Sequence, residues 1–399
     1  MKTVILGVTG GIAAYKAAQL TSDLKKKGYD VHVIMTRNAT EFVSPLTFET
    51  LSGHRVSIDT FDRNFEYNVQ HVSLARMADV FVIAPATANV IAKVANGLAD
   101  DMLTTTFLAC DCEKILCPAM NTGMLNNPAT QHNLNVLRER GMHIVESGSG
   151  ILACGDVGKG RLAEPAEIED EIEQVLYSEK ILAGKTVLVS AGATQEALDP
   201  VRYISNHSTG KMGYAIARAA RNMGAHVILV HGQTSLPALR QVEDIPVVSA
   251  AQMAEAILSR QDECDIIIKA AAVADYTPQT VADNKIKKTE GEFVLPLKRT
   301  VDILKTLGEH KPQGQILCGF AMETRDLLVN ARKKLDSKNA DMIVANSLKE
   351  KGAGFGVDTN RVTILTQEKE ESLDLMKKED LAYELLQRCY NLMKAEKGE

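Results

Sequence analysis

Residues 1–35 read MKTVILGVTGGIAAYKAAQLTSDLKKKGYDVHVIM and contain one complete βαβ pattern. A short apolar run, Thr3–Val8, leads into a glycine turn, and a second apolar run covers Val31–Met35. The lysine-rich stretch between them predicts a helix that ends near Gly28, because cations and glycine both favour a helix C-terminus. The apolar side of that helix is expected to comprise Ile12, Tyr15, Ala18 and Leu20. Two strands joined through a helix pair in parallel, so the segment predicts an α/β sheet.

The same pattern begins again at Thr186–Ser190 and continues to a second apolar run at His226–Gly232. The turn that leads from the first run to a predicted helix, MGYAIARAARNMG, is about twenty residues long, and loops of that length in a compact domain usually carry function. An acidic helical stretch separates the two patterns. The chain is therefore predicted to hold two doubly wound Rossmann-like domains, residues 1–183 and 184–399, each with a nucleotide-like ligand at a helix N-terminus. The dinucleotide fingerprint GxGxxG is missing from the sequence.

The composition narrows the class of protein. The 399 residues include 45 basic and 51 acidic side chains, a net charge of −6, which argues against binding to duplex nucleic acid or anionic membrane. Apolar runs are too short to span a bilayer, and the first residues do not resemble a secretory signal. Seven cysteines without a framework spacing favour reduced thiols and a cytoplasmic location. The spacing of Cys110, Cys112 and Cys117 matches no common zinc signature.

Polar loops follow the apolar strands of the first domain. At Gly10 and Gly11 backbone amides could approach a phosphate at a helix start. Asn121 follows a buried strand, where it is either a turn residue or a ligand-binding amide. His71, taken alone, is more typical of a structural histidine. Cys154 lies among five glycines, which would let its segment move as a lid, so its thiol is a better candidate for chemistry than one in a core strand.

These stretches resemble the family of flavin-dependent cysteine decarboxylases over about residues 1–175. The family motif P-x-M-N-x-x-M-W matches Pro118, Met120, Asn121 and Met124. Leu125 stands in place of the final tryptophan, which puts some wall packing in question but not the chemistry. The family's histidine falls on His71, and its A-C-G-D flap motif falls on residues 153–156.

The resemblance implies FMN-dependent decarboxylation of a cysteine whose thiol is first oxidised to a thioaldehyde, because the C=S group then accepts the electrons released with CO2. Asn121 would bind the substrate carboxylate, and His71 would assist the oxidation or the decarboxylation. Cys154 would donate the proton in the final reduction. The expected FMN-binding residues are Gly10, Gly11, Ile12, Thr36, Ala86, Thr87 and Asn89.

The second domain combines a polar loop with recurring lysines. An apolar strand at Asp265–Ala270 is followed by Asp275, and a further apolar strand runs into GFAMET at Gly319–Thr324. Lysines recur near these strand ends, at Lys285, Lys287, Lys288, Lys334 and Lys338. A lysine cluster is usually a solvated face, but its recurrence beside strand ends favours a polyanionic ligand such as a triphosphate.

This half resembles phosphopantothenate–cysteine ligase over about residues 184–399. The matching stretches are SAGATQEALDPVRYISNHSTGKMG, AAVADYTP, the K-x-K-K of residues 285–288, and GFAMET. Most bacterial members carry Ser-Ser-Gly where this chain has Ser-Thr-Gly at residues 208–210. The resemblance implies that CTP and Mg2+ activate the 4′-phosphopantothenate carboxylate as an acyl-cytidylate, which the cysteine amine then attacks. Asn206 would hold the carboxylate, and Lys285 would meet the triphosphate. The CTP pocket is expected to comprise Asp275, Lys285, Phe320, Lys334 and Lys338.

Together the halves resemble the bifunctional phosphopantothenoylcysteine decarboxylase/phosphopantothenate–cysteine ligase family of coenzyme A biosynthesis. The ligase product is the decarboxylase substrate, so the C-terminal domain would work first. Family members form decarboxylase trimers, with flavin at the subunit contact, and ligase dimers, which implies a homo-oligomer as large as a dodecamer. Two alternatives stay open: a flavoprotein of another chemistry, such as prenyl transfer, fused to a nucleotide-binding domain, and a flavin-binding regulatory protein.

Overall fold

The computed structural model describes residues 1–62, 69–287, 293–323, 326–347, 354 and 356–397. Within this part of the chain, every helix is too short or too polar to cross a membrane. The chain divides into two compact units, Met1–Tyr177 and Ser178–Glu399. This division lies before the expected one between residues 183 and 184. Leu182 explains the difference, because it is fully buried and its backbone N–H donates to the Met223 carbonyl of the second unit at 2.9 Å.

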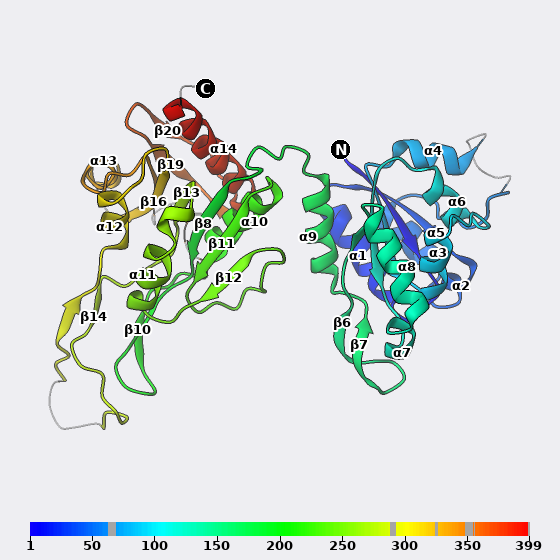
Figure 1. Cartoon of the computed structure of the whole chain (residues 1–399), viewed down its shortest axis with the longest axis horizontal. Helices are drawn as coiled ribbons and strands as arrows, with labels where there is room; N and C mark the ends of the chain where they lie inside the picture. The colour runs from blue at the N-terminus through cyan, green and yellow to red at the C-terminus, as the bar shows by residue number, and fades with distance from the viewer. Residues whose placement is uncertain (63–68, 288–292, 324–325, 348–353, 355, 398–399) are drawn as a thin grey trace. The chain divides into compact units, whose positions relative to one another are not determined.

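The first unit is built on a five-stranded parallel sheet in the order β2-β1-β3-β4-β5. Its strands are β1 (Thr3–Val8), β2 (Asp30–Met35), β3 (Val80–Ala86), β4 (Glu113–Pro118) and β5 (His143–Ile144). Its helices are α1 (Ala14–Lys26), α2 (Arg37–Thr40), α3 (Pro45–Ser52), α4 (Gln70–Met77), α5 (Ala88–Ala95), α6 (Met102–Ala109), α7 (Thr122–Leu125), α8 (Pro128–Glu139) and α9 (Pro165–Leu176). A separate hairpin joins β6 (Gly148–Ile151) to β7 (Val157–Arg161) and protrudes beside α7 in Figure 1.

Both faces of this sheet are covered, as a buried parallel sheet requires. Alternate residues of β1 enter different cores: Val4 and Leu6 pack with residues of α1 and α9, and Ile5 packs with residues of α5, α6 and α8. The predicted apolar side of α1 is wrong in two places. Ile12 is 58% exposed and Tyr15 is 60% exposed, because the helix begins only at Ala14 and buries a different stripe. The buried stripe comprises Ala14, Ala17, Leu20, Thr21 and Leu24.

The second unit contains an eight-stranded sheet in the order β12-β11-β8-β13-β16-β17-β19-β20, in which all pairs are parallel except the last two, because β19 runs against its neighbours β17 and β20. These strands are β8 (Thr186–Ala191), β11 (His226–His231), β12 (Glu243–Pro246), β13 (Ile266–Lys269), β16 (Ile316–Glu323), β17 (Met342–Ser347), β19 (Val362–Leu365) and β20 (Glu370–Ser372). The helices are α10 (Lys211–Asn222), α11 (Ala250–Leu258), η1 (Gln261–Glu263), α12 (Ile303–Glu309), α13 (Leu327–Ser337) and α14 (Lys378–Lys397).

Three short strand pairs lie outside this sheet. The long turn after β8 is not a plain loop, because it folds into a hairpin of β9 (Gln195–Ala197) and β10 (Tyr203–Ser205). An arm that carries β14 (Tyr276–Pro278) and β15 (Leu297–Arg299) extends away from the sheet (Figure 1). The third pair is β18 (Thr359–Asn360) with β21 (Met376–Lys377).

Three aspartates each fix the start of a neighbouring strand, and we call them the strand-start aspartates. They are Asp79, Asp265 and Asp341. Each precedes a parallel strand, and its carboxylate accepts one hydrogen bond from a backbone N–H of the adjoining strand and one from a lysine ammonium. At Asp265 the donors are the Thr186 backbone N–H at 2.9 Å and Lys185 Nζ at 3.1 Å. The same device thus sets the register of the first strand in both units.

Replacing Asp265 with alanine should leave the Thr186 N–H without its charged acceptor. We expect the free energy of unfolding of the second unit to fall by about 1–3 kcal/mol, the usual effect of losing a hydrogen bond to a charged group. Urea unfolding followed by circular dichroism measures this change. Asp374→Ala is the control, since Asp374 is an exposed aspartate of the same unit and its loss should cost less than about 0.5 kcal/mol. Equal destabilisation by both changes would contradict the role of Asp265.

Candidate active sites

Asn121 and Cys154 line one cavity of about 500 Å3 in the first unit, which we call the Cys154 cavity. Asn121 lies after β4, at the carboxyl edge of the sheet, and Cys154 lies at the tip of the β6–β7 hairpin. The glycine-rich segment is thus a two-stranded hairpin rather than the loop expected from its sequence. Gly11, Ile12 and Tyr15 line the same cavity, which explains why two apolar side chains near the start of α1 are exposed.

The hairpin lies in close backbone contact with the Asn121 loop. The Met120 N–H donates to the Gly160 carbonyl at 3.0 Å, and the Thr122 hydroxyl donates to the Lys159 carbonyl at 2.7 Å. Gly160 has a φ of +133°, and a Cβ at this position would lie 2.1 Å from the Met120 carbonyl oxygen. Only glycine therefore permits this approach.

A carboxylate completes the polar group at the hairpin tip. Cys154 Sγ donates to Asp156 Oδ2 at 3.3 Å, and Asn121 Nδ2 lies 3.5 Å from Cys154 Sγ and 3.4 Å from the same Asp156 oxygen. The Asn121 Oδ1 atom accepts the Gly123 N–H at 2.8 Å, which fixes the orientation of the amide. Asp156 was expected to have no role beyond its place in the flap motif. The geometry makes it the acceptor that orients the thiol.

A second cavity of about 640 Å3, the Thr36 cavity, lies at the same edge of the sheet. The expected FMN-binding residues Gly10, Thr36, Thr87 and Asn89 line it. Thr36 and Thr87 are also the N-caps of α2 and α5, so each stands at a helix N-terminus. Ala86 lies behind them, fully buried in β3.

The hydrogen-bond donors that line the Thr36 cavity are suited to binding the phosphate and the polyol of FMN. Hydroxyls, side-chain amides of Asn38 and Asn89, and helix N-termini are the groups that hold phosphate and sugar oxygens. The turn before α1 packs tightly, since a Cβ at Gly10 would lie 2.4 Å from Asn38 Cβ. Gly11 and Ile12 face the adjoining Cys154 cavity instead.

His71 is not among the described residues that line the Cys154 cavity or the Thr36 cavity. It is the second residue of α4 and is half-buried. Leu125, in place of the family's tryptophan, is buried in the core beneath the Asn121 loop. The chain thus places two of the three expected catalytic groups of this half together.

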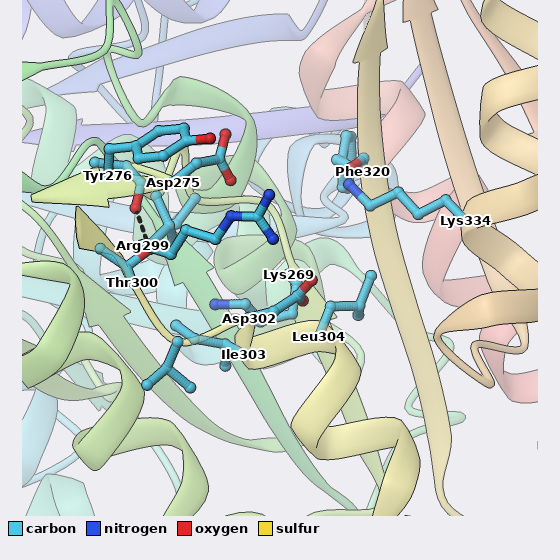
Figure 2. Close-up of a pocket in the computed structure, with 14 residues that line it drawn as sticks. Lys269, Asp275, Tyr276, Arg299, Thr300, Asp302, Ile303, Leu304, Phe320 and Lys334 are labelled. Atoms are coloured by element: carbon cyan, nitrogen blue, oxygen red, sulfur yellow. Dashed lines mark hydrogen bonds between the residues drawn. The ribbon is translucent and has the colours of Figure 1, made fainter. Parts of the chain in front are cut away.

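The second unit has two cavities at the carboxyl edge of its large sheet. The Asn206 cavity, of about 420 Å3, is lined by the loop before α10 and by the end of β17. The Lys269 cavity, of about 480 Å3, lies between the ends of β13 and β16 and the start of α12. Asp275, Phe320 and Lys334 line both cavities, so the two adjoin. In Figure 2 the side chains of Arg299 and Lys334 approach the Lys269 cavity from opposite sides.

Three of the expected nucleotide-binding residues therefore lie together, and two do not. Lys338 lies outside both linings and its Nζ donates to Asp302 at 2.6 Å. Lys285 is exposed on the arm between β14 and β15. Its neighbour Ile286 is anchored through its N–H to Asp199 at 3.0 Å, and the Arg202 guanidinium holds the pKa of that carboxyl well below its usual range. Lys288 of the K-x-K-K motif and Thr324 of GFAMET fall outside the described residues.

Lys269 is a candidate functional residue that the sequence analysis missed. It is the last residue of β13, is only 7% exposed, and lines the cavity named after it. Its signal in the sequence is a lysine that ends an apolar strand, a place where a charge is costly. Burial, with a smaller effect from nearby Lys334, lowers the pKa of Lys269 to about 7.

One described cluster offers three groups of the kind that bind metals. Asp30 and His32 lie at the start of β2, on the edge opposite the cavities, and His54 lies just after α3. Each imidazole Nε2 lies within hydrogen-bonding distance of one Asp30 oxygen, at 3.1 and 2.7 Å, and the two rings stack. These groups satisfy one another, so we assign no metal to them. None of the seven cysteines, all of which the structure describes, forms a disulfide, and the thiol of Cys154 is the exposed one.

Comparisons with known proteins agree with this division into two sites. The Flavoprotein family model matches residues 1–177, and the model of the DNA/pantothenate metabolism flavoprotein C-terminal domain matches residues 182–393. The coenzyme A biosynthesis bifunctional protein CoaBC of Bacillus subtilis (strain 168) is 53% identical over 397 residues, 98% of each chain. A cysteine/cysteine sulfinic acid decarboxylase from an unknown prokaryotic organism is 47% identical, over 88% of this chain and 99% of that protein. A crystal structure of the C-terminal domain of a CoaBC protein is 44% identical, covers 54% of this chain and 99% of that one, and has a TM-score of 0.47.

The fold and the two sites define a bifunctional enzyme, with an FMN-dependent decarboxylase half and a ligase half. The chain belongs to the family of coenzyme A biosynthesis bifunctional proteins. Its two halves carry out successive steps of that pathway, the attachment of cysteine to 4′-phosphopantothenate and the decarboxylation of the product to 4′-phosphopantetheine.

Gly160→Ala should displace the β6–β7 hairpin from the Asn121 loop, since the new Cβ cannot fit beside the Met120 carbonyl. We expect the rate of CO2 release to fall by about tenfold or more, because small misplacements of catalytic groups are costly. Release of 14CO2 from 4′-phosphopantothenoylcysteine labelled in the carboxyl group measures this. The ligase activity of the same protein is the internal control and should stay unchanged. A normal decarboxylase rate would show that the close hairpin contact is not required.

Proposed function

We propose that the ligase half uses CTP and Mg2+ to activate 4′-phosphopantothenate. A carboxylate oxygen attacks the α-phosphorus of CTP, the bond to pyrophosphate breaks, and an acyl-cytidylate forms. The cysteine amine then attacks the acyl carbon, loses a proton and displaces CMP to give the amide. The observation that carries this proposal is that the Asn206 and Lys269 cavities share lining residues and so adjoin, because two substrates must meet for the first step.

Asn206 is placed to hold the carboxylate that is activated. It lines the Asn206 cavity, and its Nδ2 donates one hydrogen to the Ala272 carbonyl at 3.1 Å. The second hydrogen of this amide can donate to a substrate oxygen. Phe320 and Asp275 lie where the two cavities meet, beside the nucleotide. Lys334 donates to the Phe320 carbonyl at 2.8 Å, which holds its ammonium at the wall for a phosphate.

In the decarboxylase half, bound FMN supplies the oxidation of the substrate thiol to a thioaldehyde and returns the two electrons after CO2 has left. We propose that Asn121 binds the substrate carboxylate and that Cys154 donates a proton to carbon in the final reduction. The hydrogen bond from Cys154 Sγ to Asp156 orients the thiol for that transfer. The Ile12 and Tyr15 side chains supply an apolar wall that limits water.

We propose that the chain assembles into decarboxylase trimers and ligase dimers. Two observations support this. His71 lies outside both cavities of its own unit, and Lys285 is exposed on an arm that extends from the large sheet. A neighbouring copy would bring His71 to the flavin and Lys285 to the triphosphate. We propose a cytoplasmic location, which is supported by the finding that none of the seven cysteines forms a disulfide.

Replacing Cys154 with serine should stop the decarboxylase at the ene-thiol stage, because a hydroxyl is a far weaker acid than a thiol. CO2 is still released, while the saturated product falls by about a hundredfold or more. Mass spectrometry of the products, which differ by two hydrogens, measures the ratio. Cys112→Ser is the control, since Cys112 lies outside the cavity linings. Saturated product at the wild-type rate would exclude Cys154 as the proton donor.

The wild-type protein should release pyrophosphate from CTP when 4′-phosphopantothenate and Mg2+ are present, and Lys285→Gln should slow this step by about a hundredfold. The reason is that the leaving pyrophosphate loses a compensating positive charge. Quenched-flow detection of the acyl-cytidylate measures the step, and ATP in place of CTP tests the base. Lys298→Gln, on the same arm at an exposed position, is the control. Acyl-cytidylate formation at the normal rate in Lys285→Gln would remove the residue from the mechanism.

A further inference from the structure

Lys269 presents a buried amine with no partner. Its Nζ atom is inaccessible to solvent and makes no hydrogen bond to any described residue. The backbone around it is fixed, because Lys269 pairs in register with Ser190 of β8 on one side and Gly319 of β16 on the other. An unsatisfied donor at such a depth is costly unless a ligand completes it. The residue borders a cavity of about 480 Å3, and a rotation of its side chain would bring the buried Nζ to a ligand there.

The charges that face Lys269 come from every element around the cavity. Lys334 of α13 and Arg299 of β15 are positive, and Asp302 at the start of α12 and Asp275 after β13 are negative. Tyr276 is the remaining titratable group in the lining. Asp302 is already engaged, because its carboxylate accepts from Lys338 Nζ at 2.6 Å and from the Lys305 N–H at 3.0 Å.

The cavity therefore holds an excess of positive charge at its buried end. Lys269 and Lys334 repel each other, and both this repulsion and burial hold the pKa of the Lys269 amine at about 7. Two like charges facing one space are stabilised when an anion lies between them. A neutral ligand could accept a hydrogen bond from Lys269 but would leave the repulsion from Lys334 in place.

We propose that Lys269 is a further binding residue of the ligase reaction, whose amine donates to a phosphate oxygen of the nucleoside triphosphate. This inference rests on the proposed use of a nucleoside triphosphate by the ligase half. Lys269 supplies one contact to the phosphates, and Lys334, whose side chain is also drawn at the cavity in Figure 2, supplies another. The amine is charged in the complex and largely neutral in the ligand-free protein at pH 8.

This arrangement couples triphosphate binding to proton uptake. The ligand-free amine has lost most of its proton at pH 8, and a bound phosphate raises the pKa of Lys269 towards its ordinary value. Binding at pH 8 should therefore take up about one proton, and the uptake should vanish near pH 6, where the amine is already charged. Between about pH 7 and 10 the unfolded chain still binds this proton, while the folded ligand-free protein has lost it. The free energy of unfolding of the ligand-free protein should therefore increase as the pH rises through this range.

Isothermal titration calorimetry on the full-length holoenzyme tests the proposal. Inorganic triphosphate, CTP and 4′-phosphopantothenate are titrated separately at pH 8 in two buffers of different ionisation enthalpy, which gives the number of protons taken up. For Lys269→Met we expect binding of inorganic triphosphate and CTP to weaken by about tenfold to a hundredfold, and the proton uptake to be lost. Lys305→Met is the matched control, since Lys305 is exposed on α12 and pairs only weakly with Glu309 at 3.6 Å.

The thermal midpoint of the ligand-free protein separates binding from a structural role. Lys269→Met removes a buried, unpartnered amine without a large change in volume, so its midpoint should not fall below that of the wild type. If this variant does not fold, Lys269→Gln and the proton uptake of the wild-type protein decide the question. The proposal would be overturned if the wild-type protein binds CTP and Lys269→Met binds it with the same affinity and the same proton uptake. A loss confined to 4′-phosphopantothenate would overturn it too, and a wild type that binds no triphosphate would overturn the proposed ligase function as well.

Discussion

Parallel pairing of the first strand with a neighbour on each side is the constraint on which both sites depend. β1 pairs with β2 and β3, and β8 pairs with β11 and β13, all in parallel. Parallel strands end at the same edge of a sheet, so the loops that follow them converge there whatever their separation in the sequence. For this reason Asn121 and Thr36 lie at one edge of the first sheet, and Asn206 and Asp275 line one cavity of the second unit. The apolar strands thus set where chemistry can occur, and the loops set which chemistry it is.

The sequence allowed the two sheets and much of both sites to be predicted, because strands, glycine turns and polar loops leave local patterns. Asn121 and Cys154 were predicted together and lie together. The predicted apolar side of α1 is wrong because it takes Ile12 as the first helical residue, and the helix begins two residues later. The local pattern could not show whether Ile12 faces a core or a cavity, since both places favour an apolar side chain.

Other features depend on contacts that no local pattern encodes. A run of glycines predicts freedom of movement, yet at Gly160 the glycine is needed for close contact with the Met120 carbonyl. Lys269 ends an apolar strand, and its significance comes from Lys334, which lies some sixty residues later in the chain. His71 and Lys285 matched family motifs, but a motif match does not say whether a residue serves its own chain or a neighbouring one.

The segment before β8 bears on how the two halves came to share one chain. Leu182 is buried within the second unit. Gly224, in the turn after α10, leaves room for Lys180 and Ala183 to lie against that turn. The last helix of the first unit, α9, ends at Leu176, and its core is complete without this segment. This segment therefore packs as part of the second unit. A gene fusion, or a fission that separates the two activities, needs to change only a few residues here without disturbing either core.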